Sequence, residues 1–408
     1  MLFLLGLAGA AAAETPRVTE IRFAGNAVTR PEVMLREMNL RPGDPADPDR
    51  IARSRQAILD LGLFREVRIE QVPEAGGVAL DVHVREKRYV LPIPRADTST
   101  DRDYSYGGQL RWSNIGGLNH SMNVYIEQGR FRDDLNRERE RTARLAYTAP
   151  YVFDTPYNLS TSIGRLERVN PGQSGSFEET FHHAELHLSR DLSWRRPRRG
   201  WTFGGGLLWQ TQRAEGEFAP PSDGEALAAV LSADFHDVRF NVYSESGRRF
   251  VTRLETASDA LLSDYGYTRL TGRYIEYRPL GDTPHQTLHL IADGGWYADG
   301  PRSRNAFSLG GASRLRGYES DWLEGQRYWH VAAEYLRPLG HNWLRLLAVA
   351  EAGGTDDAVL GRREGGPYAS VGLGVRIRLT WFVDIEIEAG IAYPLRGGDG
   401  ARFFARGN

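Results

Sequence analysis

The side chains best suited to chemistry in this sequence are its histidines and carboxylates. His182, Glu185 and His187 lie close together, but in an extended strand His182 and His187 point to opposite faces. The 408-residue sequence has no Gly-x-Ser-x-Gly and no His-Glu-x-x-His pattern, the signatures of a serine nucleophile and of a zinc-bound water. Cysteine is absent, which excludes thiolate metal ligands and disulfides. We therefore expect no enzyme activity, no metal and no cofactor.

A second candidate is a glycine-rich segment with two arginines at residues 309–321, LGGASRLRGYESD. Its glycines permit backbone conformations and close approaches that other residues do not. Its guanidinium groups would bind carboxylates, because a charge removed from water is costly unless it is paired. The tetrapeptide LRGY alone is typical of a surface turn, so its meaning depends on the elements that hold it. The residues of interest are Gly310, Gly311, Leu315, Arg316, Gly317 and Tyr318.

The N-terminal residues indicate an exported protein. Residues 1–13 combine a short apolar run with alanines that are typical of a signal-peptide cleavage site, although no Lys or Arg precedes the run. A buried N-terminal helix is the alternative. No later stretch of about 20 apolar residues could form a membrane-spanning helix. The net charge of −2 gives no support for nucleic-acid binding.

Residues 14–88 have the pattern of a small α+β domain. Alternating apolar residues from Val18 predict a strand. Two helices follow, the first capped by Thr29 and the second ending at about Leu61, and then two alternating strands. This β-α-α-β-β order, with LGLF at residues 61–64, resembles a POTRA domain. The resemblance implies that the domain binds client polypeptides by adding a strand to an exposed sheet edge.

Residues 89–408 alternate between apolar and polar side chains in about sixteen segments. In VDIEIEAGI, residues 383–391, the valine and isoleucines face one way and the acidic residues the other. A soluble sandwich is the alternative, but charges of both signs on neighbouring segments and aromatic residues at segment ends are typical of a membrane β-barrel with a wet interior. An even number of segments suits a closed barrel. The aromatic residues include Trp112, Trp201, Trp296, Trp343 and Trp381.

A signal sequence, one POTRA-like domain, sixteen segments and LRGY before the twelfth together resemble the BamA/TamA superfamily of outer-membrane proteins. In that family a Val/Leu-Arg-Gly-Phe/Tyr motif lies on a loop that folds into the barrel and docks on its inner wall. Here the motif is residues 315–318 and the loop is residues 298–325. The implied fold is a transmembrane β-barrel of about sixteen antiparallel strands, preceded by one α+β POTRA domain.

Alternation identifies two carboxylates that could meet the motif arginine. Trp329 and Val331 belong to the lipid face of the twelfth segment, so Glu334 points inward. Glu351 points inward from the thirteenth segment by the same argument, and the resemblance implies that both contact Arg316. The family usually has Asp where Glu351 stands, in an Asp-x-Gly pattern, so the reach of the side chain differs while its charge does not. A solvated loop is the alternative to this docking.

The first and last segments predict a weak seam in the barrel. Pro92 and Pro94 in the first segment each remove a hydrogen-bond donor. The last segment is short and contains Phe403 and Phe404, but it lacks the terminal aromatic residue usual in the family. Frayed termini are the alternative interpretation. A seam that can open is what insertion of polypeptide into the membrane would need.

These observations favour a non-enzymatic factor that inserts or translocates polypeptides at the bacterial outer membrane, with its POTRA domain in the periplasm. The resemblance implies outer-membrane lipids and unfolded outer-membrane or secreted clients as partners, with periplasmic or inner-membrane accessory proteins as further candidates and no nucleic acid. One alternative is a two-partner-type secretion pore for a dedicated exoprotein. Another, from a different class, is a barrel enzyme such as a lipase or protease. Assembly, secretion of one client and a lipid-related role all stay open.

Overall fold

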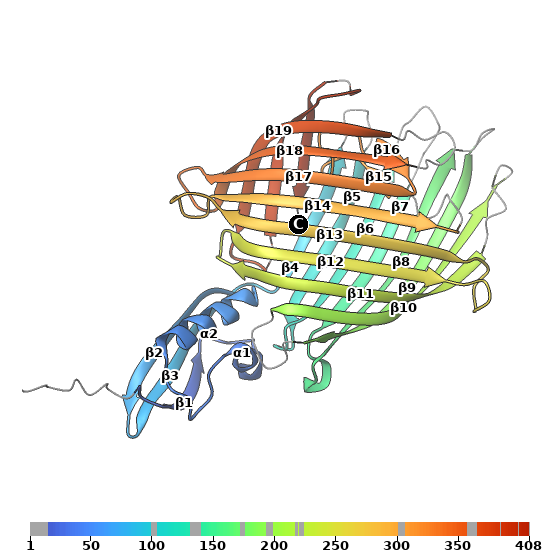
Figure 1. The fold of residues 1–408 in the computed structure, drawn as a ribbon. Coiled ribbons are helices and arrows are strands. Elements are labelled where there is room, and N and C mark those ends of the chain that lie inside the picture. Colours follow the sequence, from blue (N-terminus) through green and yellow to red (C-terminus); the bar gives the residue numbers. More distant parts are fainter. Residues whose placement is uncertain are drawn as a thin grey trace, which may run out of the picture.

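The computed structural model has two parts, a small N-terminal α+β domain and a large sheet that curves into a barrel (Figure 1). The predicted signal peptide, residues 1–13, lies outside the described residues, as do residues 301–306 of the predicted inward loop. The structure describes residues 15–98, 104–130, 140–171, 176–192, 199–216, 219, 224–300, 307–356, 365–383, 385–398 and 400–407.

The N-terminal domain has the predicted β-α-α-β-β order. Its sheet has the strand order β1-β3-β2, with β1 parallel and β2 antiparallel to β3. Apolar residues of both helices and of the sheet form one buried core, which includes Met34, Ile58, Phe64 and Leu80. Neither helix is long and apolar enough to cross a bilayer. The elements are β1 (Val18–Ala24), α1 (Pro31–Glu37), α2 (Pro48–Asp60), β2 (Phe64–Glu74) and β3 (Gly77–Glu86).

Thr29 does not cap α1, so that prediction was wrong. The N-cap residue is Arg30, which makes no side-chain capping hydrogen bond. The Thr29 hydroxyl instead donates to Glu86 at 2.5 Å and accepts from Asn114 Nδ2 at 2.8 Å. Burial raises the pKa of Tyr89, whose protonated hydroxyl lies 3.0 Å from the Thr29 hydroxyl. Thr29 therefore links the N-terminal domain to the barrel.

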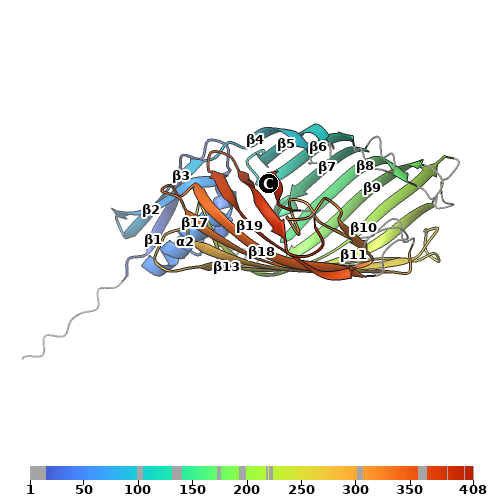
Figure 2. The same ribbon diagram turned by 90° about the horizontal axis from the view of Figure 1, so that it is seen from above.

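Sixteen strands form one continuous sheet in which each strand is antiparallel to its neighbours, which confirms the predicted fold class. Seen from above, β4–β9 form one wall and lie opposite β13, β17 and β18 (Figure 2). The strands are β4 (Val90–Thr98), β5 (Tyr104–Ile115), β6 (His120–Arg130), β7 (Glu140–Ala149), β8 (Tyr157–Pro171), β9 (Ser176–Asp191), β10 (Gly200–Glu215), β11 (Gly224–Phe240), β12 (Glu245–Ala257), β13 (Tyr267–Pro279), β14 (Thr287–Ala298), β17 (Arg327–Pro338), β18 (Leu344–Asp356), β19 (Gly365–Leu379), β20 (Ile385–Pro394) and β21 (Arg402–Gly407). A separate hairpin pairs β15 (Phe307–Leu309) with β16 (Leu323–Gly325).

The outer surface of the barrel is apolar and its interior is charged. Alternate residues of each strand, such as Ile163, Leu231 and Leu373, are exposed on the outside, where lipid would cover them. All five tryptophans that the sequence marked at segment ends are also exposed. Charged residues such as Arg376 and Glu388 are buried on the inner face. The alternating apolar and polar residues of the sequence therefore face the lipid and the lumen, respectively.

The two terminal strands of the sheet form an unjoined seam. In the described residues β4 pairs with β5 and β21 pairs with β20, but no ladder joins β4 to β21. The predicted closed barrel is therefore a curved sheet with two free edges. Near the domain junction the gap narrows, because Arg88 forms a parallel bridge with Phe382 just before β20. Pro92 and Pro94 lie on one edge of the seam, and Phe403 and Phe404 lie on the other.

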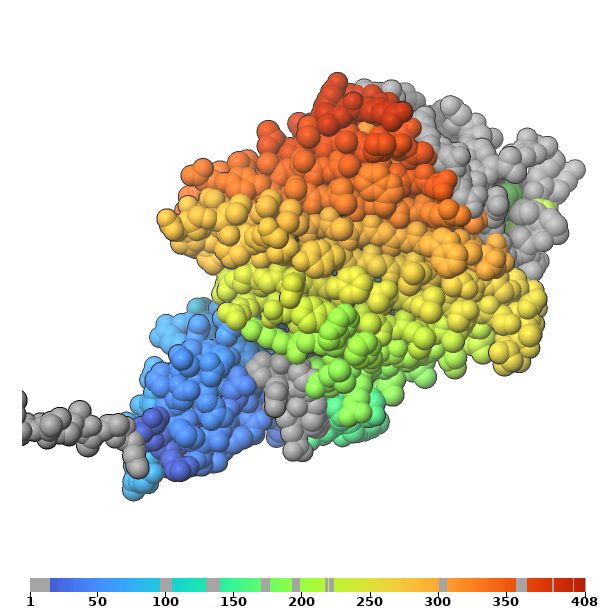
Figure 3. Space-filling view, in the orientation of Figure 1, coloured from blue at the N-terminus to red at the C-terminus, as the bar shows by residue number. Residues whose placement is uncertain are grey.

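The N-terminal domain rests against one end of the barrel (Figure 3). The main-chain N–H of Arg30 donates to the carbonyl of Gly117 at 3.0 Å, in the turn between β5 and β6. On the other side of the domain, Asp60 accepts from the main-chain N–H of Phe240 at 2.8 Å. These contacts reach two separate places on the barrel, the turn between β5 and β6 and the end of β11, and they fix the orientation of the domain. The loop between β14 and β17 starts from the opposite end of the barrel (Figure 1).

Candidate functional site: the inward loop and its ion network

The connection between β14 and β17 turns back into the barrel, and two of its glycines explain how. Gly310 has a φ of +127°, and a Cβ there would lie 1.9 Å from the carbonyl oxygen of Glu319. Gly317 is in contact with the barrel wall, because a Cβ there would lie 2.8 Å from the main-chain nitrogen of Pro394. Gly311 also has a positive φ, +88°. The turn at residues 310–311 and the close approach at residue 317 both require the absence of a side chain.

Arg316 is buried and pairs with glutamates on two adjacent strands. Its Nη2 donates to Glu334 on β17 at 2.5 Å, and its Nη1 donates to Glu351 on β18 at 3.2 Å. Its main-chain N–H also donates to Glu351. The three side chains are no more than 2% exposed, so each charge depends on the others for compensation. The structure brings together the three residues that the sequence analysis grouped.

Three further charges extend this network, and the sequence analysis did not assign them to it. Arg376 on β19 binds Glu334 at 2.5 Å and also pairs with Glu388 on β20. Arg406 on β21 donates to Glu388 through Nε and Nη2, at 2.8 Å each. Glu388 also lies 3.5 Å from Arg316. Opposite charges on neighbouring segments were a visible signal for the Arg376–Glu388 pair, but no signal showed that it reaches the loop.

Tyr318 and Leu315 dock the rest of the motif. The Tyr318 hydroxyl is shared between two main-chain carbonyls, Ala369 at 2.9 Å and Arg396 at 2.8 Å. Leu315 is fully buried in an apolar cluster that contains residues of the β15–β16 hairpin. The motif is therefore held by ion pairs, by hydrogen bonds to the wall and by apolar packing at once.

A second small ion cluster flanks the motif. Arg314 Nε lies 2.8 Å from Asp293 on β14, and His330 on β17 bridges Asp293 at 2.9 Å and Glu351 at 3.3 Å. His330 therefore connects the Arg314 contact to the Arg316 contact. The sequence analysis did not assign His330 to any site. Its position on the inner face of β17, four residues from Glu334, was the signal that could have identified it.

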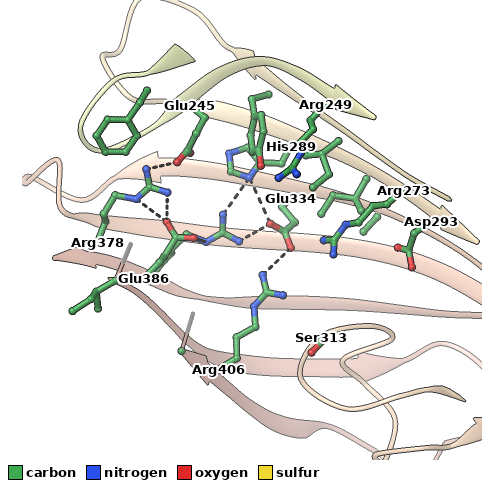
Figure 4. Close-up of a pocket in the computed structure, with 18 of the residues that line it drawn as sticks. Glu245, Arg249, Arg273, His289, Asp293, Ser313, Glu334, Arg378, Glu386 and Arg406 are labelled. Carbon is green, nitrogen blue, oxygen red and sulfur yellow. Dashed lines mark hydrogen bonds and ion pairs between the residues drawn. The ribbon is translucent and has the colours of Figure 1, made fainter. Parts of the chain in front are cut away.

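A polar cavity of 970 Å³ lies between this network and the wall of β12–β14. Figure 4 shows Glu334 facing His289 and Arg406, while Arg378 binds Glu245 and Glu386. The lining is rich in arginine, and no group of three or more metal-binding side chains occurs in the described part of the chain. The two histidines considered as catalytic candidates contact different residues, His182 with Thr211 and His187 with Ser232. This arrangement can bind and hold charged groups.

The residues predicted at the seam differ in orientation. Pro92 and Pro94 are exposed on β4. Phe403 is 70% exposed on the outside of β21, whereas Phe404 points inward and is 3% exposed. The Phe404 ring lies 5.6 Å from the guanidinium carbon of Arg316. The two phenylalanines therefore belong to different surfaces, one to the lipid face and one to the loop site.

Two family models match this chain. The POTRA family, "Surface antigen variable number repeat", matches residues 16–87, and the "Omp85 superfamily domain" matches residues 114–403. Among curated relatives, outer envelope protein 80 of Oryza sativa subsp. japonica is 24% identical over 332 residues, which is 75% of this chain and 48% of that protein. Outer membrane protein assembly factor BamA of Neorickettsia risticii is 40% identical over 190 residues, 43% of this chain and 24% of that protein. The chain thus matches less than half the length of these relatives.

Solved structures share the fold. BamA from Haemophilus ducreyi lacking POTRA domains 1–3 aligns with a TM-score of 0.58 at 14% identity, over 97% of this chain and 85% of that chain. CdiB from Escherichia coli aligns with a TM-score of 0.66 at 15% identity, over 97% and 76%. The predicted location, an outer-membrane barrel with its POTRA domain in the periplasm, is confirmed by the superfamily match and by the BamA relative, not by these structures. The chain belongs to the Omp85 superfamily.

Proposed function

We propose that this protein inserts outer-membrane polypeptides through the seam between β4 and β21, after receiving them at the edge of its POTRA sheet. Action at the outer membrane on polypeptides is the role its superfamily supports at the family level. The observation that carries the specific proposal is the pair of free strand edges at the seam. A free edge presents unpaired N–H and C=O groups, which can accept another strand.

The prolines of β4 favour an open seam. β4 has a ladder with β5 in which the main-chain N–H of Ser113 donates to the carbonyl of Tyr89, so Tyr89 and every second residue after it turn their hydrogen-bonding groups toward β5. Prolines on an edge strand turn their nitrogens away from the neighbouring strand. Both nitrogens therefore face β21, where they remove two donors that a closed seam would use. Closing this gap would gain fewer hydrogen bonds than closing any ordinary pair of strands.

The POTRA domain offers a further free edge, in addition to the two at the seam. In the order β1-β3-β2, the start of β1 is covered by main-chain hydrogen bonds with residues 43 and 44. The outer edge of β2 has no such ladder in the described residues. Near its beginning, Arg65 Nη2 lies 3.4 Å from the carbonyl of Trp381, in the turn before β20. A strand bound to β2 would therefore end close to the seam.

Reversible locking of the seam tests the proposal. The chain has no cysteine, so Pro94→Cys and Phe403→Cys can be joined selectively by a reducible bis-thiosulfonate linker. We expect the locked protein to fold, to lose client insertion into liposomes, and to recover it on reduction. The matched control locks Leu145→Cys to Ile163→Cys, which face each other across the paired strands β7 and β8. Normal insertion by the locked seam would refute lateral insertion.

A secretion pore is a second candidate, favoured by the similarity of fold to CdiB. In that case the client would cross the lumen, and the docked loop would have to leave it. The same locked protein separates the two functions. A pore would keep working with the seam locked, but it would stop when the loop is tethered by cysteines to the inner wall.

A further inference from the structure

The inner face of the terminal strand β21 contacts the inward loop or its ion network at every second residue. Arg402 forms an ion pair with Glu319 of the loop. Phe404 places its ring 5.6 Å from the guanidinium carbon of Arg316. Arg406 binds Glu388, which also lies 3.5 Å from Arg316. The loop and the strand are thus in direct contact at two positions and share a carboxylate at a third.

In the part of the chain that the structure describes, main-chain hydrogen bonds hold β21 on one edge only, whereas the inner strands of the barrel are paired on both edges. The strand has six residues and pairs with residues 387–392 of β20. Its other edge faces the seam, where no ladder is present in the described strands. A short edge strand with hydrogen bonds on one side frays at low cost. Side-chain contacts on its inner face should therefore contribute a large share of its local stability.

We propose that the docked loop positions β21, with Glu319 and Arg316 as the residues that hold the strand through Arg402 and Phe404. Loop and strand then stabilise each other, because a contact between two elements must favour both by the same free energy. Undocking of the loop would release β21 and widen the seam. This coupling can be measured without any client. Its consequence for transport rests on the proposed function.

Replacement of Arg406 should affect the loop less than replacement of Arg402. Arg406 and Arg316 approach the same oxygens, Glu388 Oε2 and Glu334 Oε1. Two cations that share carboxylates compete for them, so loss of Arg406 leaves the glutamates more available to Arg316. Arg406→Gln should therefore loosen β21 more than it loosens the loop, because the freed carboxylates offset part of the loss at the loop. Arg402→Gln should loosen both.

Amide hydrogen exchange of the whole protein in lipid nanodiscs, followed by mass spectrometry of residues 307–325 and 401–408, tests this. In Glu319→Gln, Arg402→Gln and Phe404→Leu we expect about three- to tenfold faster exchange in both segments, the range for a partly exposed ion pair or a cation–π contact. The control is Arg253→Gln, because Arg253 binds Glu185 and Glu255 in the lumen away from the loop. It should change neither segment.

A charge swap distinguishes the loss of the ion pair between Glu319 and Arg402 from a general destabilisation of the protein. Glu319→Arg combined with Arg402→Glu should restore slow exchange in both segments, whereas either change alone should not. Tyr318→Phe removes the hydrogen bonds from the loop to Ala369 on β19 and to Arg396 in the connection between β20 and β21, without touching β21 itself. It should also accelerate exchange in residues 401–408. The proposal is overturned if β21 exchanges at its wild-type rate in Glu319→Gln and Tyr318→Phe, or if the swap restores nothing.

Discussion

Glu351 binds Arg316 twice, once through the main-chain N–H and once through Nη1 at 3.2 Å. The carboxylate therefore fixes both the backbone of the motif and the direction of its side chain. Glu334 fixes the same guanidinium from the neighbouring strand, with Nη2 at 2.5 Å. An arginine held at three points in this way cannot leave without exposing two buried carboxylates to each other.

Replacement of Arg316 should impair assembly of the barrel. Arg316→Ala removes one partner of a buried pair, which typically costs about 3–5 kcal/mol, and water in the lumen reduces that cost. Arg316→Lys should recover part of the loss, since an ammonium lacks the planar fork that binds two carboxylates. Arg316→Glu should be worst, and adding Glu334→Arg should partly restore it. The readout is the yield of heat-modifiable folded barrel.

Arg253→Ala is the matched control for these variants, because Arg253 also binds two glutamates in the lumen but none of the loop. It should assemble close to the wild-type yield. If every Arg316 variant assembles as well as Arg253→Ala, the ion pairs seen at Arg316 have no role in assembly.

Variants of Glu351 separate the effect of charge from that of reach. Glu351→Asp keeps the charge but is one methylene shorter, so it can keep one of the two contacts and should cost about 1 kcal/mol. Glu351→Gln keeps the length but leaves Arg316 short of a negative charge, so it should cost several times more. Urea titration of the folded fraction measures both. If Glu351→Asp and Glu351→Gln lose the same free energy of unfolding, the negative charge alone is not what the site requires.

The strand count was predictable because lipid and lumen impose strict alternation. The inward direction of Glu334 and Glu351 followed from the same rule. Strand ends were less predictable. β11 runs from Gly224 to Phe240, but apolar and polar residues alternate clearly only within residues 227–236 of the sequence. Where a strand extends beyond the membrane, its outer face no longer has to be apolar. The alternation of apolar and polar residues therefore ends before the strand itself ends.

Contacts between distant strands were not predictable. Glu388 and Arg406 lie on the inner face by alternation, but their contact with Arg316 depends on how the curved sheet brings its last strands against the loop. Thr29 was misassigned for a similar reason. Its partner Glu86 is far along the chain, and a local capping pattern does not contain that information.

Gly317→Ala should weaken docking of the loop. The added methyl group would lie 2.8 Å from the main-chain nitrogen of Pro394 and 2.9 Å from the Ser370 Cβ, and overpacking of this kind typically costs about 1–3 kcal/mol. Trypsin cleavage after Arg314 or Arg316 in the folded protein should therefore become faster. Gly272→Ala is the control, because a Cβ at Gly272 meets nothing within 4 Å. If trypsin cleaves Gly317→Ala and Gly272→Ala at the same rate, the close approach at residue 317 is contradicted.

The POTRA domain, expressed alone as residues 14–88, should fold and bind extended peptides. Its buried core is formed by residues of the domain itself, including Met34, Leu40 and Leu80. Peptides with alternating apolar residues, copied from barrel strands, should shift the amide resonances of β2 (Phe64–Glu74), which is the free edge of the sheet. The affinity should be weak, with a Kd of about 0.1–1 mM, because the peptide must lose conformational freedom when it binds. A peptide of the same composition with its alternation scrambled should shift these resonances much less. Equal shifts for both peptides, or shifts confined to α1 and α2, would argue against strand addition at β2.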